Sequence, residues 1–322
     1  MSKNNPVDFE PIDSFSDVLT YSVENHDSKN SVYNTITKRI IDLMNNGIIP
    51  WSKPWNNKNG VFNLPHNFFS DKPYRGINLL LLSCAGYQSS EWLTKKQILG
   101  RHGKIKDGEL PMPVVFFAPS KRFEKNYFFL KTYGVYNIEQ TEGIKPIKKR
   151  KVTEEPEFQH EPIEIAESIV ADLINKPGIS IGNTNEAKYS IGEDKIYIPG
   201  MEQYRDIDEF YSTLFHELIH STGSKNRLKR STLINRDHEN YSKEELVAEL
   251  GSAFLCAHCG ISSEKVIENQ AAYINGWLKA ISGDNSLVVS AASLAQKAVS
   301  WIFKNSAKKP SSEVEKETEL AA

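Results

Sequence analysis

The sequence predicts an α+β fold in two domains, and three observations lead to that prediction. The chain has 322 residues, which is long for one compact domain. Its charge is unevenly divided: residues 31–150 carry 19 Lys and Arg against 8 Asp and Glu, a balance of +11, whereas residues 151–322 carry 18 against 27, a balance of −9. Segments with helical periodicity also alternate with short apolar stretches typical of strands.

The first predicted domain covers residues 31–144. It follows an extension, residues 1–30, that has 2 basic and 6 acidic residues and no periodicity, so we expect the extension to be disordered. A helix is expected from Ser31 to a C-cap at Asn46 and Gly47, because apolar residues recur there every three or four positions. The prolines of PWSKPW (50–55) exclude a helix. Strands are expected at 113–119 and 133–138.

A proline-containing segment at residues 145–162 changes from basic to acidic and predicts a linker. The second domain, residues 163–305, opens with an amphipathic helix at 163–174. The elements expected after it are strands at 178–182 and 194–199 and helices near 206–222, 242–259, 264–281 and 290–304. Residues 306–322 are expected to form a disordered tail.

The composition argues against several classes of protein. No apolar run reaches the roughly 18 residues that a membrane helix needs, and residues 1–30 lack the plan of a signal peptide. Three cysteines, an odd number, argue against a disulfide framework. Cys256 and Cys259 form a CAHC segment with no second pair, so we expect core thiols. The sequence therefore predicts a cytoplasmic protein with no membrane partner.

The segment FHELIH (215–220) predicts a metal site. His216 and His220 are four residues apart and lie on one face of a helix, where two imidazoles can chelate one divalent ion, typically Zn²⁺. Glu217 lies between them and can reach a metal-bound water as general base. The alternative is a helix with incidental histidines, but the flanking residues are apolar and an unpaired buried pair is costly. We expect one Zn²⁺ per chain.

A catalytic zinc ion needs a third protein ligand. Glu245 and Glu249 are again four residues apart, so one can bind the metal while the other orients a ligand histidine. A competing interpretation makes Glu245 part of a capping box with Ser242. ELVAE (245–249) resembles the Glu-x-x-Ala-Asp stretch that begins with the ligand glutamate in zincin metallopeptidases. This resemblance favours Glu245 as the ligand and Glu249 as the residue behind a histidine.

The first domain interleaves aromatic and basic residues. Aromatic rings stack on unpaired bases while cations follow the phosphates, so the pattern indicates binding of single-stranded DNA. The alternative is that the aromatic residues belong to the core. The candidate DNA-binding residues are Trp51, Lys53, Trp55, Tyr74, Arg75, Trp92, Lys95 and Lys96.

Four segments, at 32–55, 72–82, 92–97 and 136–144, resemble the N-terminal domain of ArdC-type antirestriction proteins. The order DKIYIP, HELIH and EELVAELGSAFL in the second half is similar to that family too. The family's N-terminal domain binds single-stranded DNA, its C-terminal domain is a zincin-like metallopeptidase, and its members protect mobile-element DNA, including plasmid DNA, from host restriction. His102, where the family usually has glycine, and the acidic extension are departures from the pattern.

The resemblance implies a gluzincin-like zinc metallopeptidase tethered to a single-stranded DNA-binding domain, acting on a protein substrate that the sequence does not identify. Zinc held by His216, His220 and Glu245 would activate a water for Glu217 to deprotonate. The strand at 194–199 is expected to be a sheet edge that pairs with an extended peptide. The alternative is a DNA-coating protein that acts by occlusion, with a structural or vestigial metal site and no proteolysis.

Overall fold

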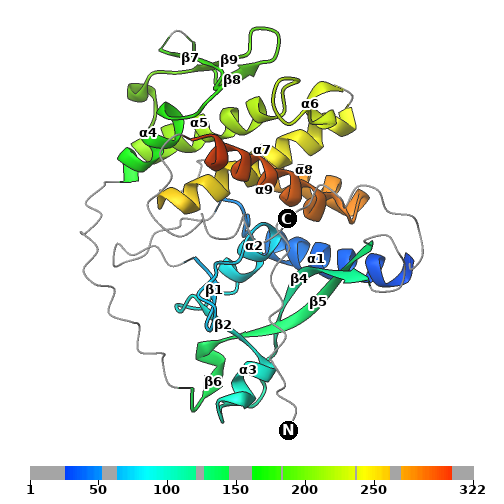
Figure 1. Ribbon diagram of the computed structural model, residues 1–322. Helices are drawn as coiled ribbons and strands as arrows, with labels where there is room; N and C mark the ends of the chain where they lie inside the picture. The colour runs from blue at the N-terminus through cyan, green and yellow to red at the C-terminus, as the bar shows by residue number, and fades with distance from the viewer. Residues whose placement is uncertain are drawn as a thin grey trace.

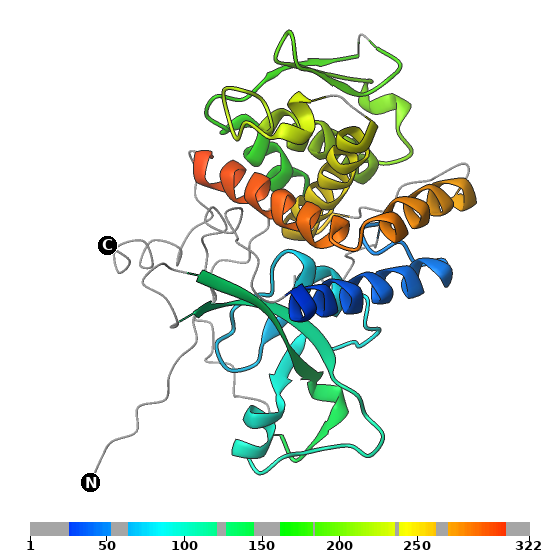
Figure 2. The same cartoon turned by 90° about the vertical axis from the view of Figure 1, so that its right-hand side faces the viewer.

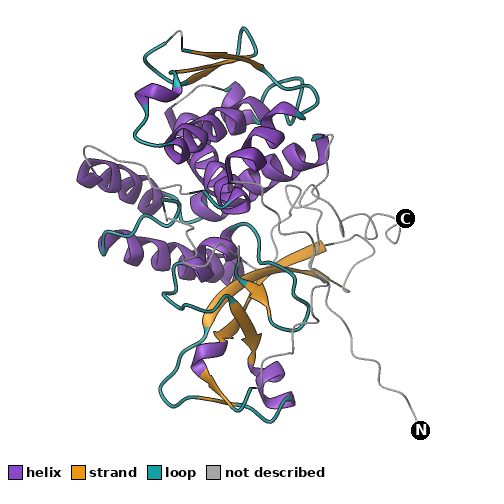
Figure 3. Cartoon of the chain, turned by 90° about the vertical axis from the view of Figure 1, so that its left-hand side faces the viewer, coloured by secondary structure: helices purple, strands orange, loops and turns teal. Residues whose placement is uncertain are grey.

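The computed structural model describes residues 26–52, 64–120, 127–144, 162–182, 184–235, 238–261 and 270–306. These residues form an N-terminal unit with a twisted sheet and a C-terminal unit that is mainly helical (Figure 1). Figure 3 shows the helices of the C-terminal unit lying between a small sheet at one end of the molecule and the N-terminal sheet at the other. The predicted α+β class is confirmed.

The N-terminal unit is built on a four-stranded sheet of order β1-β2-β5-β4. Strands β4 and β5 form a long antiparallel pair, with Met112 opposite Val135, and β1 is parallel to β2. The strands are β1 (His66–Asn67), β2 (Glu91–Thr94), β4 (Met112–Ser120) and β5 (Tyr127–Asn137), with a second pair β3 (Lys104–Ile105) and β6 (Thr141–Glu142). The helices are α1 (His26–Asn45), α2 (Ile77–Ser83) and α3 (Lys95–Gly100).

Helix α1 confirms the first predicted helix but begins at His26 rather than Ser31. Its apolar positions at three- and four-residue spacing are buried, and Ile36 and Ile40 are fully so. The helix stops where expected, because Gly47 adopts a left-handed φ of 75° and donates its N–H to the carbonyl of Met44. Residues 1–25 of the predicted extension lie outside the described residues.

The C-terminal unit consists of helices around α5 and α7 with a three-stranded sheet of order β7-β9-β8. Strand β9 is therefore central, and the prediction that this segment is a sheet edge is wrong. The two edges are β7 and β8, and β8 is a strand that sequence reasoning did not assign. The strands are β7 (Gly178–Ile181), β8 (Lys188–Ser190) and β9 (Lys195–Ile198). The helices are α4 (Pro162–Ala171), α5 (Ile207–Thr222), α6 (Ser231–Ile234), α7 (His238–Cys259), α8 (Gln270–Gly283) and α9 (Leu287–Asn305).

The two units share one continuous hydrophobic core. Buried residues of α1 and α2 belong to the same cluster as those of α5, α7 and α9. Hydrogen bonds also join the units: Thr37 Oγ1 donates to the carbonyl of Asn285 at 2.6 Å, and the N–H of Gly76 donates to Gln296 Oε1 at 3.0 Å. Figure 2 shows α1 running beside α8. Residues 145–161 of the predicted linker lie outside the described residues, as do residues 307–322 of the predicted tail.

The long apolar helices of the C-terminal unit pack inside the molecule. Cys256 and Cys259 on α7 are fully buried thiols with no disulfide between them, as predicted. Within the described residues, no single helix is long and apolar enough to cross a membrane, although Tyr273–Gly283 and Leu287–Asn305 together meet that length and composition as a pair bent by 104°.

Candidate metal centre

Helix α5 carries the predicted histidines, and its first turn is fixed by side chains. Asp206 is the N-cap and accepts the backbone N–H of Glu209 at 2.8 Å. The carboxylate of Glu209 accepts the backbone N–H of Arg205, one residue before the N-cap, at 3.0 Å. The apolar face of the helix, which includes Phe215 and Leu218, is fully buried. Packing of that face fixes the rotation of α5 and turns its polar face toward α7.

Helix α7 supplies the acidic residues. It begins at His238, so Ser242 lies inside the helix and the capping-box interpretation of Glu245 is wrong. The close approach to α5 depends on Gly251, because a Cβ there would lie 2.8 Å from the side chain of Ile219. One turn of α7 is also tied to α5 by Ser252, whose hydroxyl donates to the carbonyl of Ser212 at 2.7 Å.

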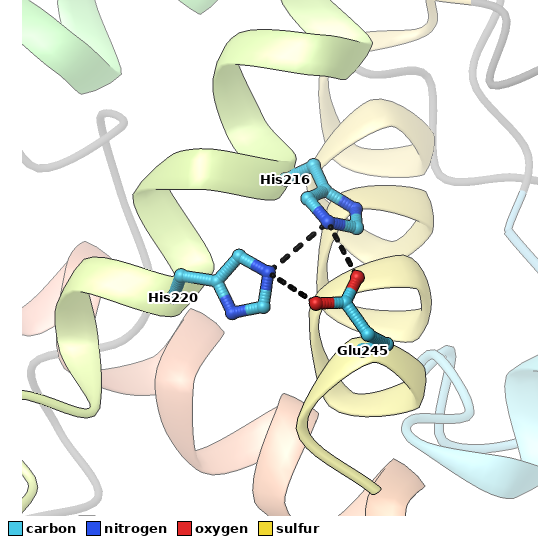
Figure 4. A group of neighbouring side chains, drawn as sticks. All are labelled: His216, His220 and Glu245. Atoms are coloured by element: carbon cyan, nitrogen blue, oxygen red, sulfur yellow. Dashed lines mark hydrogen bonds and ion pairs between the residues drawn. The ribbon is translucent and has the colours of Figure 1, made fainter. Parts of the chain in front are cut away.

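His216, His220 and Glu245 converge on one point between the two helices (Figure 4). The Nε2 atoms of the two histidines are 3.1 Å apart. The carboxylate of Glu245 lies across both rings, with Oε2 at 3.5 Å from Nε2 of His216 and Oε1 at 3.6 Å from Nε2 of His220. Ligand atoms on a tetrahedral ion with bonds of about 2.0–2.2 Å lie about 3.3–3.6 Å apart. The two nitrogens and one oxygen therefore fit a single divalent cation.

Charge at the site favours an ionised Glu245. Burial alone would raise the pKa of Glu245, but its hydrogen bond with His216 and the charges of His220 and His216 lower it below the usual value. Burial would lower the pKa of His220, but its hydrogen bond to Glu244 and the negative charges of Glu244, Glu245 and Glu217 raise it.

Glu244 is a buried residue of the site that sequence reasoning missed. Its Oε1 accepts a hydrogen bond from Nδ1 of His220 at 3.3 Å, which leaves Nε2 of that ring facing Glu245. The carboxylate also accepts from Arg230 Nε at 3.0 Å and from the hydroxyl of Thr232. Burial alone would raise the pKa of Glu244, but the hydrogen bonds from His220 and Arg230 lower it to about 2.

Arg230, also missed, joins this carboxylate to the end of α5. Its Nη2 donates to the carbonyl of Ile219 at 2.8 Å, which also accepts a hydrogen bond from the hydroxyl of Thr222 at 2.6 Å near the helix C-terminus. Gly223 makes room for it, since a Cβ there would lie 2.8 Å from Nη2. The signal in the sequence was the doubled acid at 244–245 together with an arginine shortly after FHELIH, but nothing in the spacing showed which acid faces the arginine.

Glu249 lies behind the other histidine. Its Oε1 is 3.7 Å from Nδ1 of His216, and that nitrogen is buried without a hydrogen bond. Glu245 faces both Nε2 atoms and Glu249 faces neither, and the division of roles between these two acids remains a prediction.

The three side chains border a cavity of about 340 Å³ that is partly open to solvent. Glu217 lines this cavity although most of its side chain is buried. One wall comes from the edge strand of the small sheet. The lining residues are Ala187, Lys188, Tyr189, His216, Glu217, His220, Thr232, Leu233, Tyr241, Glu244 and Glu245.

The candidate DNA-binding residues do not share one environment. Trp51 and Trp92 are 2% and 1% exposed, so neither ring can stack on a base, and the interpretation that placed them in the core is the correct one. Trp92 packs edge-on against Tyr87. Arg75, Lys95 and Lys96 are exposed and Tyr74 is half-buried, whereas Lys53 and Trp55 lie outside the described residues.

Comparison with protein families divides the chain in two. Residues 30–157 match the N-terminal domain of anti-restriction factor ArdC, and residues 166–294 match a zincin-like metallopeptidase domain. The two matches follow one another along the chain and together cover most of it.

Similar proteins occur in bacteria. The chain is 30% identical to protein y4eC of Sinorhizobium fredii over 84% of its own length and 91% of that protein. It is 29% identical to a DNA primase TraC of Escherichia coli over 85% of its length, but it spans only 27% of that primase. Among solved structures, it is similar to antirestriction protein ArdC of plasmid R388 in its Mn(II)-bound form, with 31% identity, a TM-score of 0.68 and coverage of 86% of this chain and 98% of the other. The metal-free form of that protein gives a TM-score of 0.67.

Proposed function

Because the chain belongs to the ArdC family of antirestriction proteins, we propose that it protects the DNA of a mobile element from restriction in a host cell. In this proposal the N-terminal unit binds single-stranded DNA and the C-terminal unit is a metal-dependent peptidase. The observation that carries the second half is the convergence of His216, His220 and Glu245 beside Glu217 in a partly open cavity.

The cation would be held by Nε2 of His216, Nε2 of His220 and the carboxylate of Glu245. A zinc ion suits this donor set, since imidazole and carboxylate are both common zinc ligands, and the related R388 protein carries Mn(II) in one of its structures. When bound, such an ion supplies Lewis acidity, which lowers the pKa of a water and polarises a carbonyl.

Glu217 would take a proton from the attacking water and pass it to the leaving nitrogen of the substrate. It is suited to this role because it follows the ligand His216 in sequence and lines the cavity without being one of the three converging groups. A structural metal site has no use for such a carboxylate and fills its fourth position with protein. A cavity beside the ligands therefore supports the catalytic interpretation.

A peptide substrate would bind along the edge strand β8. Lys188 and Tyr189 of this strand line the cavity, and within the described sheet β8 pairs only with β9. An extended peptide can add to such an edge through main-chain hydrogen bonds. The peptide would then run past the histidines with one of its carbonyl groups facing the metal site.

The N-terminal unit would hold single-stranded DNA mainly through cations. The balance of +11 over residues 31–150 and the exposure of Arg75, Lys95 and Lys96 support this part of the proposal. Of the aromatic residues predicted to bind DNA, Tyr74 is the one in the described residues that remains a candidate, since it is half-buried whereas Trp51 and Trp92 are in the core.

The test is the variant Glu217→Gln, which removes the base while conserving side-chain shape. We expect wild-type protein to bind one divalent ion per chain and to cleave a protein substrate, and the variant to bind the ion and single-stranded DNA with affinities within about a factor of two but to lack cleavage. Protection of DNA from restriction should disappear together with cleavage. If the variant still protects DNA fully, the protein acts by coating DNA and the proteolytic proposal is wrong.

A further inference from the structure

His216 and His220 are oriented from different parts of the molecule. A histidine that presents Nε2 to a metal carries its proton on Nδ1, and that proton needs an acceptor. For His220 the acceptor is Glu244 at 3.3 Å, which Arg230 and Thr232 hold within the C-terminal unit. For His216 the acceptor within reach is Glu249, but at 3.7 Å the hydrogen bond is not made. Because Glu249 is the carboxylate that faces Nδ1 of His216, the way Glu249 is held decides whether this hydrogen bond can form and orient the ring.

Glu249 is held by a residue of a different helix. Tyr273, on α8, is close enough to Glu249 for the two side chains to interact: burial first, and then the charge of Glu249 and a hydrogen bond with it, raise the pKa of Tyr273 far above its usual value. The phenol consequently keeps its proton and remains a donor to the carboxylate. Tyr273 in turn accepts a hydrogen bond from the indole Nε1 of Trp51 at 3.3 Å.

Trp51 belongs to the N-terminal unit and is almost completely buried against α8. Its ring packs edge-on against Trp277 at 5.9 Å, and Trp277 packs edge-on against Tyr273 at 6.1 Å. The indole, the phenol and the second indole form one cluster in which the position of Tyr273 is fixed from two sides. Figure 2 shows α8 lying alongside α1, just where the N-terminal unit meets the C-terminal unit.

The donors and acceptors in the series from Trp51 to His216 can be assigned without conflict. An indole N–H can only donate, and an ionised carboxylate can only accept. Trp51 thus donates to the oxygen of Tyr273, Tyr273 can donate to Glu249, and Glu249 can accept the Nδ1 proton of His216. The hydrogen bond from His216 to Glu249 can therefore form without any of these groups changing from donor to acceptor.

We propose that Glu249, Tyr273 and Trp51 are positioning residues for His216, and that the N-terminal unit thereby sets the metal affinity of the C-terminal unit. The inference rests on the metal site proposed above. His220 is fixed inside the C-terminal unit, whereas His216 is fixed through a path that begins in the other unit. A change in the packing of Trp51 alters metal affinity without any contact between that residue and the metal.

The experiment measures Zn²⁺ affinity of the full-length protein by competition with a chromophoric chelator. We expect Glu249→Gln to weaken binding about 10- to 100-fold, as removal of the partner behind a ligand histidine does. Tyr273→Phe and Trp51→Phe should each weaken it about 3- to 10-fold, because each removes one hydrogen bond further along the path. The matched control is Tyr211→Phe, which also removes a tyrosine–glutamate hydrogen bond, to Glu167 at 3.0 Å, but touches no ligand. Its affinity should equal that of wild type.

A second readout separates positioning from general destabilisation. The visible spectrum of the Co²⁺-loaded protein reports ligand geometry, and it should change in Tyr273→Phe but not in Tyr211→Phe. The double variant Tyr273→Phe with Glu249→Gln should bind Zn²⁺ no more weakly than Glu249→Gln alone, because the tyrosine acts through the glutamate. Equal affinities and spectra for wild type, Tyr273→Phe and Trp51→Phe would overturn the inference while leaving the metal site standing. Absence of Zn²⁺ binding by wild type would overturn both.

Discussion

Replacement of Glu244 by glutamine tests whether the buried carboxylate stabilises the fold as well as the metal site. Glutamine conserves the shape of the side chain but removes the charge that faces Arg230, whose own side chain is 4% exposed. A buried guanidinium without its carboxylate is strongly unfavourable, and breaking a buried ion pair by removal of one partner costs about 3–5 kcal/mol.

A second route gives the same magnitude. The pKa of Glu244 falls from its usual value of 4.5 to about 2 in the folded protein. At about 1.4 kcal/mol per pKa unit, this difference corresponds to about 3 kcal/mol of stability at neutral pH. We therefore expect Glu244→Gln to lower the melting temperature by about 5–10 °C.

The pH dependence provides a sharper check, and it should be measured on protein kept metal-free with a chelator. Because the folded-state pKa lies below the unfolded value, the contribution of Glu244 is complete above pH 4.5 and disappears as the pH falls toward 2. The difference in unfolding free energy between wild type and variant should shrink over that interval. The control is Glu167→Gln, an exposed carboxylate bonded to Tyr211, which should change stability by less than about 0.5 kcal/mol. A Glu244→Gln protein as stable as wild type at neutral pH would refute the reasoning.

Three further predictions concern the ligand set, the DNA-binding unit and the packing of α5 on α7. Glu245→Ala should lower Zn²⁺ affinity more than Glu249→Ala in a chelator competition assay, because only Glu245 faces both Nε2 atoms; the opposite order would exchange their roles. Lys95→Ala with Lys96→Ala should weaken binding of a single-stranded oligonucleotide. The slope of log affinity against log salt concentration should also become shallower, by about one unit for each phosphate that the variant no longer neutralises. Trp92→Ala should instead lower mainly the stability of the protein, by about 3–5 kcal/mol. Gly251→Ala should destabilise the protein by about 1–3 kcal/mol in thermal unfolding, since its Cβ would lie 2.8 Å from Ile219.

The sequence alone predicted that the two histidines of the candidate metal site lie together, because this signal is local. His216 and His220 are on one face of α5 by helical periodicity, and that relation holds in any packing of the helix. The same is true of Glu245 and Glu249 on α7. The apolar repeat of α1 likewise predicted a helix and its buried face, and Gly47 marked its end.

The tertiary structure decided which side chains meet across elements. The local sequence around Trp51 does not show whether its ring is buried or exposed, because a tryptophan beside prolines can be either. Its burial is decided by contacts with Tyr273 and Trp277, which lie far away in the sequence. The edge of the small sheet was misplaced for the same reason: β8 is a three-residue strand whose pairing with β9 is not encoded in its own composition.

The glutamates of the site show most clearly which features can be predicted from sequence and which depend on tertiary structure. Helical spacing placed Glu245 and Glu249 on one face of α7, but the position of α5 relative to α7, set by packing at Gly251, determines which of them faces Nε2. Glu244 was missed because its partner Arg230 comes from the segment between the helices, where periodicity carries no information. Periodicity along one helix is fixed by backbone geometry and can be read from sequence, whereas contacts between helices depend on the packing of the whole core.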